Sequence, residues 1–84
     1  LNETFVSDED VLVFPNPNNG KFTIQSSNFK IEHLAIVNVL GEIIFQSSSI
    51  KHSETGIEVT LPKGIYSMYL NGNEKVVVKK IVVE

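Results

Sequence analysis

The chain has 84 residues, a length that suits one domain and not two. It has no cysteine and two histidines, which excludes disulfides, a cysteine-bound zinc site and the usual histidine-only metal site. A net charge of −3 argues against a nucleic-acid-binding protein, which needs a clustered basic surface, and no apolar run approaches the ~20 residues that span a bilayer. We therefore expect neither a transmembrane segment nor a cofactor.

Residues 1–10 are polar, and three carboxylates follow one another at Asp8, Glu9 and Asp10. The ligand spacing of an EF-hand is absent, so we interpret this segment as an acidic linker in preference to a calcium site. The chain starts at Leu1 without a signal-peptide pattern, and we expect it to be part of a longer polypeptide. The linker would then lead from a preceding part of that polypeptide into the domain of residues 11–84.

From residue 11 onward apolar residues alternate with polar ones, which predicts strands and leaves no room for helices. The sequence PNPNNG at residues 15–20 predicts a tight turn. A type I turn with a bulge is expected at residues 39–41, with Gly41 in the left-handed conformation, and Asn71-Gly72 predicts a hairpin turn. Residues 47–56 predict a crossing loop with a short edge strand near Ile50. The main strands are expected at residues 11–14, 21–25, 34–38, 42–46, 57–61, 65–70 and 75–83.

About seven short strands with regular turns predict an all-β fold, specifically an immunoglobulin-like two-sheet antiparallel β-sandwich. A closed barrel is the alternative. Tyr66 lies two residues after Gly64, at the start of a strand, and this spacing resembles a tyrosine corner, in which the hydroxyl bonds back to upstream backbone. The alternative is an ordinary half-buried strand tyrosine.

The sequence offers no catalytic constellation, and we do not expect an enzyme. His52, Ser53 and Glu54 are adjacent, but neighbouring residues on an extended chain point in opposite directions and cannot form a relay. His33 is interpreted as a surface residue. An exposed Tyr66 or Tyr69 could stack on a sugar, so a carbohydrate- or protein-binding module stays an alternative, as does a passive spacer.

The last strand, residues 75–83, is apolar apart from its lysines. Lysines commonly protect such a strand from pairing with other chains. Two interpretations are open: a core strand with protective charges, or a surface that a partner recognises.

Four segments in this order resemble the type A C-terminal sorting domain of the type IX secretion system, and the resemblance as a whole extends over residues 11–84. The family's opening signature corresponds here to Phe14, Pro15, Asn16, Pro17 and Gly20. Its Leu-Gly hairpin corresponds to Gly41, and its Leu-x-x-Gly-x-Tyr segment to Gly64 and Tyr66. Its lysine pair followed by aliphatic residues corresponds to Lys79, Lys80, Ile81, Val82 and Val83. The chain departs from the pattern where Phe14 replaces the commoner tyrosine and where Glu84 places an acid at the last position.

The resemblance implies a secretion signal of an exported Bacteroidota protein, with the cargo domain preceding it in the same precursor. The implied partners are the outer-membrane type IX translocon, a shuttle protein and a sortase-like cysteine peptidase that removes the domain by a cut within or upstream of residues 1–13. The implied location is the periplasm in transit and then the cell surface or the medium. Most of the motif residues would shape the fold, and Lys79 and Lys80 are the candidates for direct contact.

Overall fold

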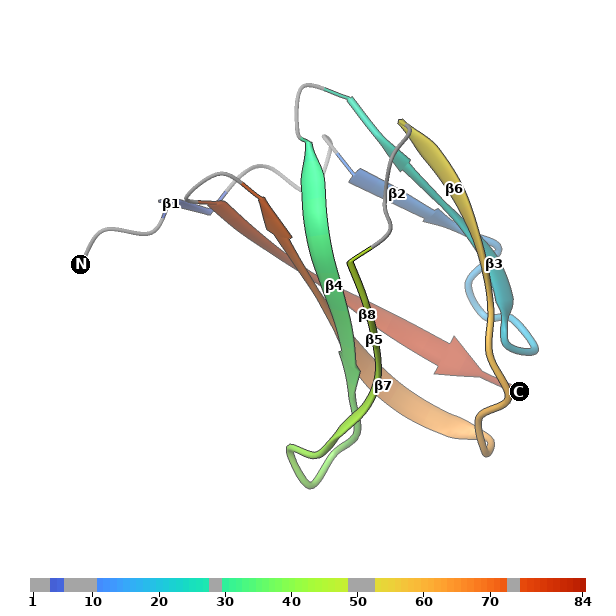
Figure 1. The fold of residues 1–84 in the computed structure, drawn as a ribbon. Helices are drawn as coiled ribbons and strands as arrows, with labels where there is room; N and C mark the ends of the chain where they lie inside the picture. The colour runs from blue at the N-terminus through green and yellow to red at the C-terminus, as the bar shows by residue number, and fades with distance from the viewer. Residues whose placement is uncertain (1–3, 6–10, 28–29, 49–52, 73–74) are drawn as a thin grey trace.

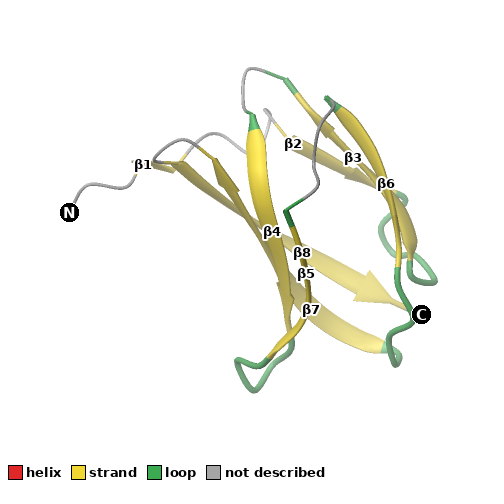
Figure 2. Ribbon diagram, viewed as in Figure 1, coloured by secondary structure: helices red, strands yellow, loops and turns green. Residues whose placement is uncertain are grey.

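In a computed structural model, which describes residues 4–5, 11–27, 30–48, 53–72 and 75–84, every regular element is a β-strand (Figures 1 and 2). Within those residues there is no helix that could cross a bilayer. The all-β class is confirmed. The strands are β1 (Thr4–Phe5), β2 (Val11–Phe14), β3 (Lys21–Ser26), β4 (Ile31–Val37), β5 (Ile43–Ser47), β6 (Glu54–Glu58), β7 (Gly64–Gly72) and β8 (Lys75–Val83).

The strands form two facing sheets (Figure 1). The larger sheet has the order β1-β8-β7-β4-β5, and the smaller has the order β2-β3-β6. Strands β2 to β8 pair antiparallel, whereas the two residues of β1 pair with β8 in parallel. The expected two-sheet antiparallel β-sandwich is confirmed.

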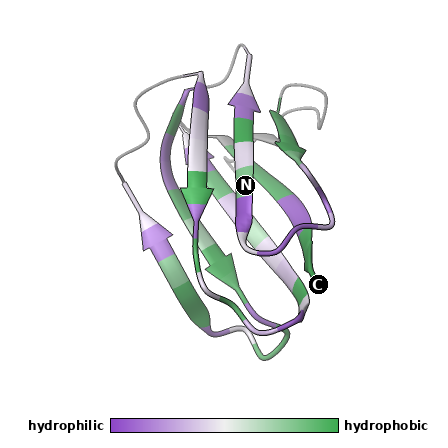
Figure 3. Ribbon diagram, turned by 90° about the vertical axis from the view of Figure 1, so that its right-hand side faces the viewer, coloured by the Kyte–Doolittle hydropathy of each residue, from purple (hydrophilic) through white to green (hydrophobic). Residues whose placement is uncertain are grey.

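The core lies between the sheets and is built by the alternation of side chains along the strands (Figure 3). Phe22 and Ile24 of β3 face inward, and the residues between them face solvent. Burying each such side chain contributes roughly 1.5–3 kcal/mol, which is how a domain of this size can fold without disulfides. The largest side chains with essentially no exposed surface are Val11, Ile24, Leu34, Ile36, Met68, Leu70, Val77 and Ile81.

Strand β6 does not lie where the alternation of residues 57–61 placed it. It runs over Glu54–Glu58, because its partner β3 begins at Lys21, opposite Glu58, where the chain enters the turn; one further bond, from the Val59 N–H to the Gly20 carbonyl oxygen, follows. Val59 and Leu61 still pack against the core from outside the ladder. Strand β4 likewise begins at Ile31, earlier than expected, because β7 is long enough to pair with it there.

The predicted hairpin turn at Asn71-Gly72 is wrong. Both residues belong to β7 and pair with Val76 and Lys75 of β8, so the connection between these strands comes two residues later, at residues 73–74. Those residues, the short strand expected near Ile50 and the acidic run at residues 8–10 lie outside the described part of the chain. Within the expected linker, Thr4–Phe5 form β1 beside the first two residues of β8.

The turn between β4 and β5 has the expected geometry. Gly41 has a φ of 87°, and its N–H donates to the carbonyl oxygen of Asn38 at 3.0 Å. The Asn38 N–H donates to the carbonyl oxygen of Glu42 at 3.0 Å, which completes a type I turn followed by a glycine bulge. The Asn38 side-chain oxygen also accepts the N–H groups of Leu40 and Glu42, so the turn is held by both backbone and side chain.

Tyr66 forms the predicted tyrosine corner. Its side chain is 7% exposed, and its hydroxyl donates to the carbonyl oxygen of Pro62, four residues upstream. The ring lies against Gly64, where an added Cβ would be 3.7 Å from the nearest ring atom. The corner therefore fixes the path of the chain as it enters β7.

We expect Tyr66→Phe to lower the free energy of unfolding by about 0.5–1.5 kcal/mol, the net value of one hydrogen bond. The measurement is chemical denaturation of the 84-residue chain. Tyr69→Phe is the matched control, because the Tyr69 side chain is on the surface, and it should change stability by less than about 0.5 kcal/mol. Equal stabilities for the two variants would show that the corner hydrogen bond is not a stabilising feature.

Candidate functional site: the turn at residues 15–20 and the terminal strand

The side chain of Asn16 joins the turn at residues 15–20 to the last strand, β8. Its Nδ2 donates to the carbonyl oxygen of Lys80 at 2.8 Å, and its Oδ1 accepts the N–H of Val82 at 2.9 Å. The side-chain amide thus supplies the donor and the acceptor that a neighbouring strand would offer to the outer edge of β8. These bonds connect residues 64 and 66 positions apart in the sequence.

The backbone of Asn18 continues this pairing toward the C-terminus. Its N–H donates to the carbonyl oxygen of Val82 at 2.9 Å, and its carbonyl oxygen accepts the N–H of Glu84 at 2.8 Å, which makes a parallel bridge to Val83. The outer edge of β8 is therefore covered from Lys80 to Glu84 by the turn. At the other end of the strand β1 covers its first two residues. Such covering protects an edge against pairing with another chain.

The side chain of Asn18 holds the turn together from inside. Its Nδ2 donates to the carbonyl oxygen of Pro15 at 3.0 Å, and its Oδ1 accepts the N–H of Gly20 at 2.8 Å. Asn18 is only 7% exposed, and no buried side-chain nitrogen or oxygen of the described residues lacks a hydrogen-bond partner. Asn18 is thus a structural residue of the junction that the predicted site residues did not include, although an asparagine between Pro and Gly is a usual sign of a side chain that bonds its own turn.

We expect Asn18→Ala to lower the free energy of unfolding by about 2 kcal/mol, because the buried Gly20 N–H and the partly buried Pro15 carbonyl oxygen lose their partner. Thermal unfolding followed by circular dichroism measures the loss. Asn19→Ala is the matched control: Asn19 is exposed and its Oδ1 accepts one N–H, that of Lys21, at 3.2 Å. An Asn18→Ala protein as stable as Asn19→Ala would contradict this role.

Gly20 ends the turn where the chain passes close to the segment after β6. Its φ is 104°, and an added Cβ would lie well within 3.0 Å of the Val59 carbonyl oxygen. The carbonyl oxygen of Gly20 accepts the Val59 N–H at 2.9 Å. The turn is thus attached to β8 of the larger sheet on one side and to the smaller sheet on the other.

The terminal strand divides its residues between two environments. Ile81 and Val83 face the core, as their partners Tyr66 and Gly64 do, whereas Lys80 and Val82 face outward. Lys79 pairs with the fully buried Met68 and so lies on the core-facing side, half-buried. Because adjacent residues of a strand point to opposite faces, one docking surface can include Lys80 but not Lys79.

The other motif residues are not all near this junction. Phe14 ends β2 with an exposed ring, and Gly64 begins β7, beside the end of β8. Gly41 lies in the β4–β5 hairpin, on the far side of the sheet, with β7 and β4 between it and β8. The structure therefore brings the PNPNNG turn and the last strand together and leaves Gly41 as a separate turn.

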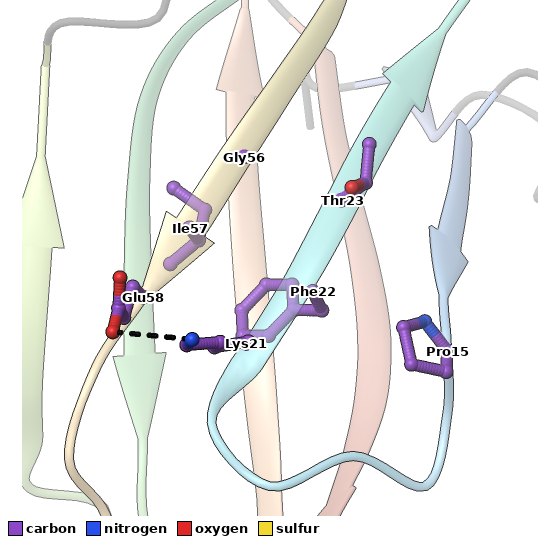
Figure 4. Close-up of a pocket in the computed structure, with 7 residues that line it drawn as sticks. All are labelled: Pro15, Lys21, Phe22, Thr23, Gly56, Ile57 and Glu58. Carbon is purple, nitrogen blue, oxygen red and sulfur yellow. Dashed lines mark ion pairs between the residues drawn. The ribbon is translucent and has the colours of Figure 1, made fainter.

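A shallow pocket lies on the outer side of the smaller sheet (Figure 4). Beside it Lys21 Nζ and Glu58 Oε2 are 3.8 Å apart, both strongly exposed, and such a pair contributes little to stability. The aromatic residue in its lining, Phe22, is buried in the core and offers no face for a sugar. Tyr66, one of the two rings that the carbohydrate-binding alternative required to be exposed, is buried as well, which leaves Tyr69 for that alternative. The pocket residues are Pro15, Lys21, Phe22, Thr23, Gly56, Ile57 and Glu58.

No group of three or more histidine, cysteine, aspartate or glutamate residues suited to a metal ion occurs within the described residues. Of the adjacent His52, Ser53 and Glu54, His52 lies outside them, and Glu54 is an exposed residue of β6. His33 is half-buried in β4.

These features define a β-sandwich module in which a turn near the N-terminal end of the module, at residues 15–20, holds the last strand in place. The chain matches the family described as the secretion system C-terminal sorting domain over residues 12–84, and it belongs to that family. It is a type IX secretion system sorting domain, as the four sequence segments indicated. No curated protein matches the chain.

Proposed function

We propose that this domain directs a cargo joined to its N-terminal side across the outer membrane, and that the type IX translocon and a shuttle protein recognise it as a folded unit. The observation that carries the proposal is the junction between the PNPNNG turn and β8. It joins two of the four segments in which the chain resembles the family by hydrogen bonds from Asn16 and Asn18. A recognition feature that is rigid before binding loses little conformational entropy when it binds.

The motif residues would divide between two roles. One set shapes the fold and holds the junction: Phe14, Pro15, Asn16, Pro17, Gly20, Gly41, Gly64, Tyr66, Ile81 and Val83. Lys80 and Val82 face outward and would meet the partner directly. Lys79 would serve the domain from the core-facing side of β8, and we therefore assign direct contact to Lys80 alone of the pair.

We further propose that a sortase-like peptidase removes the domain by a cut N-terminal to Val11. Two facts support this position. Residues 11–14 pair along their whole length with β3, and a strand held in a sheet does not enter a protease cleft. Val11 is also completely buried, whereas the acidic run at residues 8–10 precedes it directly.

The experiment is to fuse residues 1–84 behind a periplasmic reporter in a host that has the secretion system. We expect the reporter at the cell surface or in the medium, and in the periplasm when the domain is absent or when residues 79–84 are deleted. A reporter that stays in the periplasm with the intact domain would contradict the signal function. Delivered reporter that still carries the domain would contradict its removal and leave the signal function standing.

A further inference from the structure

The two sheets present outer faces of different chemistry. The smaller sheet mixes charged and polar residues, among them Lys21, Gln25 and Glu58, with the exposed Leu12 and Phe14 of β2. The larger sheet shows mainly aliphatic and aromatic residues at its outward positions. Monomeric proteins seldom leave a contiguous apolar surface on one face unless something binds there.

Three adjacent rows of outward residues cross the paired strands of the larger sheet, and a fourth row, of His33, Asn71 and Val76, lies beyond the third. The first row is Ile65 and Val82, the second is Ile43, Val37, Ser67 and Lys80, and the third is Gln46, Ala35, Tyr69 and Val78. Paired residues of neighbouring strands have side chains on the same face, so the rows form one surface. We call it the outer apolar face, and its exposed apolar members are Ile43 at 57%, Ile65 at 54%, and Tyr69 and Val78 at 39% each.

One charge stands in this surface. In the three rows, all of which lie in the described part of the chain, Lys80 is the residue with a charged side chain, although the chain as a whole carries −3. Its neighbours are Val78 and Val82 along β8 and Ser67 across the pair. Lys80 lies on β8, the outermost strand of the sheet at this level, so the cation stands at one side of the apolar surface. An apolar surface that carries one cation is complementary to an apolar surface with a carboxylate.

From this arrangement we infer that the outer apolar face is the docking surface for a partner protein with aliphatic and aromatic side chains around a carboxylate opposite Lys80. The inference rests on the proposed function, since the partner would be the component of the export machinery that recognises the domain. A second copy of the chain fits less well, because a two-fold contact through this face would enclose two Lys80 cations in one apolar interface. Strand addition at the C-terminal end of β8 is blocked by Asn16 and Asn18, which leaves the face of the strand for contact.

The test uses the same reporter fusion with two pairs of variants. Val78→Glu and Lys80→Glu place a carboxylate on the outer apolar face, and Gln25→Glu and Lys21→Glu make the matched changes on the outer face of the smaller sheet. We expect the first pair to reduce surface delivery at least about tenfold, since like charges in an interface cost several kcal/mol. The second pair should deliver as the unsubstituted domain does.

Folding is checked on the purified 84-residue variants by thermal unfolding. If Val78→Glu fails to fold, Lys80→Glu decides, because its side chain is exposed and its loss should leave the core unchanged. Normal delivery by a folded Lys80→Glu domain would overturn the inference while the proposed function stands. Failure of the intact domain to deliver the reporter would instead remove the proposed function itself. Sedimentation velocity measures whether the 84-residue chain forms a dimer. A dimer that the Val78→Glu substitution dissociates would contradict docking of a different partner and would show that the outer apolar face binds a second copy of the chain.

Discussion

Gly20→Ala should be among the most destabilising single substitutions in this domain, lowering the free energy of unfolding by about 2–4 kcal/mol. A φ of 104° is costly for any residue with a Cβ, at about 1–3 kcal/mol. The new methyl group would also overlap the Val59 carbonyl oxygen, which is backbone and cannot rotate away. Relief of that overlap would break the hydrogen bond from Val59 to Gly20, worth about 1 kcal/mol more.

The measurement is the melting temperature, which should fall by roughly 10–25 °C, since 1 kcal/mol shifts a domain of this size by about 4–8 °C. Two other glycines separate the causes. Gly41 has a φ of 87° but open space around it, so Gly41→Ala tests backbone strain alone. Gly56 has neither strain nor a close neighbour, so Gly56→Ala should be neutral or slightly stabilising. If Gly20→Ala melts no lower than Gly41→Ala, the close approach to Val59 has no energetic weight.

Ile81→Ala should destabilise the domain by about 2–5 kcal/mol, because it removes a fully buried aliphatic side chain and leaves a cavity. Ile81 is opposite Tyr66 in the pairing of β8 with β7 and belongs to the core cluster. Urea denaturation of the 84-residue chain measures the loss as a lower midpoint with an unchanged slope. Delivery of a reporter should fall with stability, because this residue is not on the surface.

Val82→Ala is the matched control, one residue further along the same strand. Val82 faces outward and is half-buried, so its truncation should cost less than about 1 kcal/mol of stability. The two variants should therefore differ in folding. Ile81→Ala should reduce delivery of the reporter because the domain unfolds, whereas the Val82→Ala domain should stay folded, so that any change in its delivery reflects contact with the partner. Equal stabilities would mean that β8 does not alternate between core and surface as the structure has it.

Much of the fold could be predicted from local pattern. Strand β8 and strand β2 have the expected bounds, and Gly41 closes the turn that its position indicated, because alternation and turn chemistry are properties of a few adjacent residues. The errors have one cause. A strand ends where its partner ends, as at Glu58 opposite Lys21, and it continues through a good turn sequence, as at Asn71 and Gly72, when a partner is still available. The apolar and polar pattern of one segment predicts that it is a strand, but the ends of the strand depend on the length of the strand that pairs with it.

The candidate site was predictable in composition but not in arrangement. The PNPNNG turn and the lysine pair could be picked out as distinctive segments, yet nothing local indicates that Asn16 bonds to the backbone of Lys80 and Val82. That Lys79 and Lys80 face opposite sides of the sheet follows from a general rule, because adjacent residues of a strand point to opposite faces. It could be applied only once Met68 showed which side of β8 is the core.

The position of β1 has a mechanical consequence. It lies beside Lys75 and Val76, whereas Glu84 follows the other end of the same nine-residue strand, a span of roughly 30 Å (Figure 1). A folded protein joined ahead of Thr4 would therefore be attached at the end of the sandwich opposite the C-terminus of the domain. The point where a preceding domain would join is therefore separated by the length of β8 from the junction of the PNPNNG turn with the end of that strand.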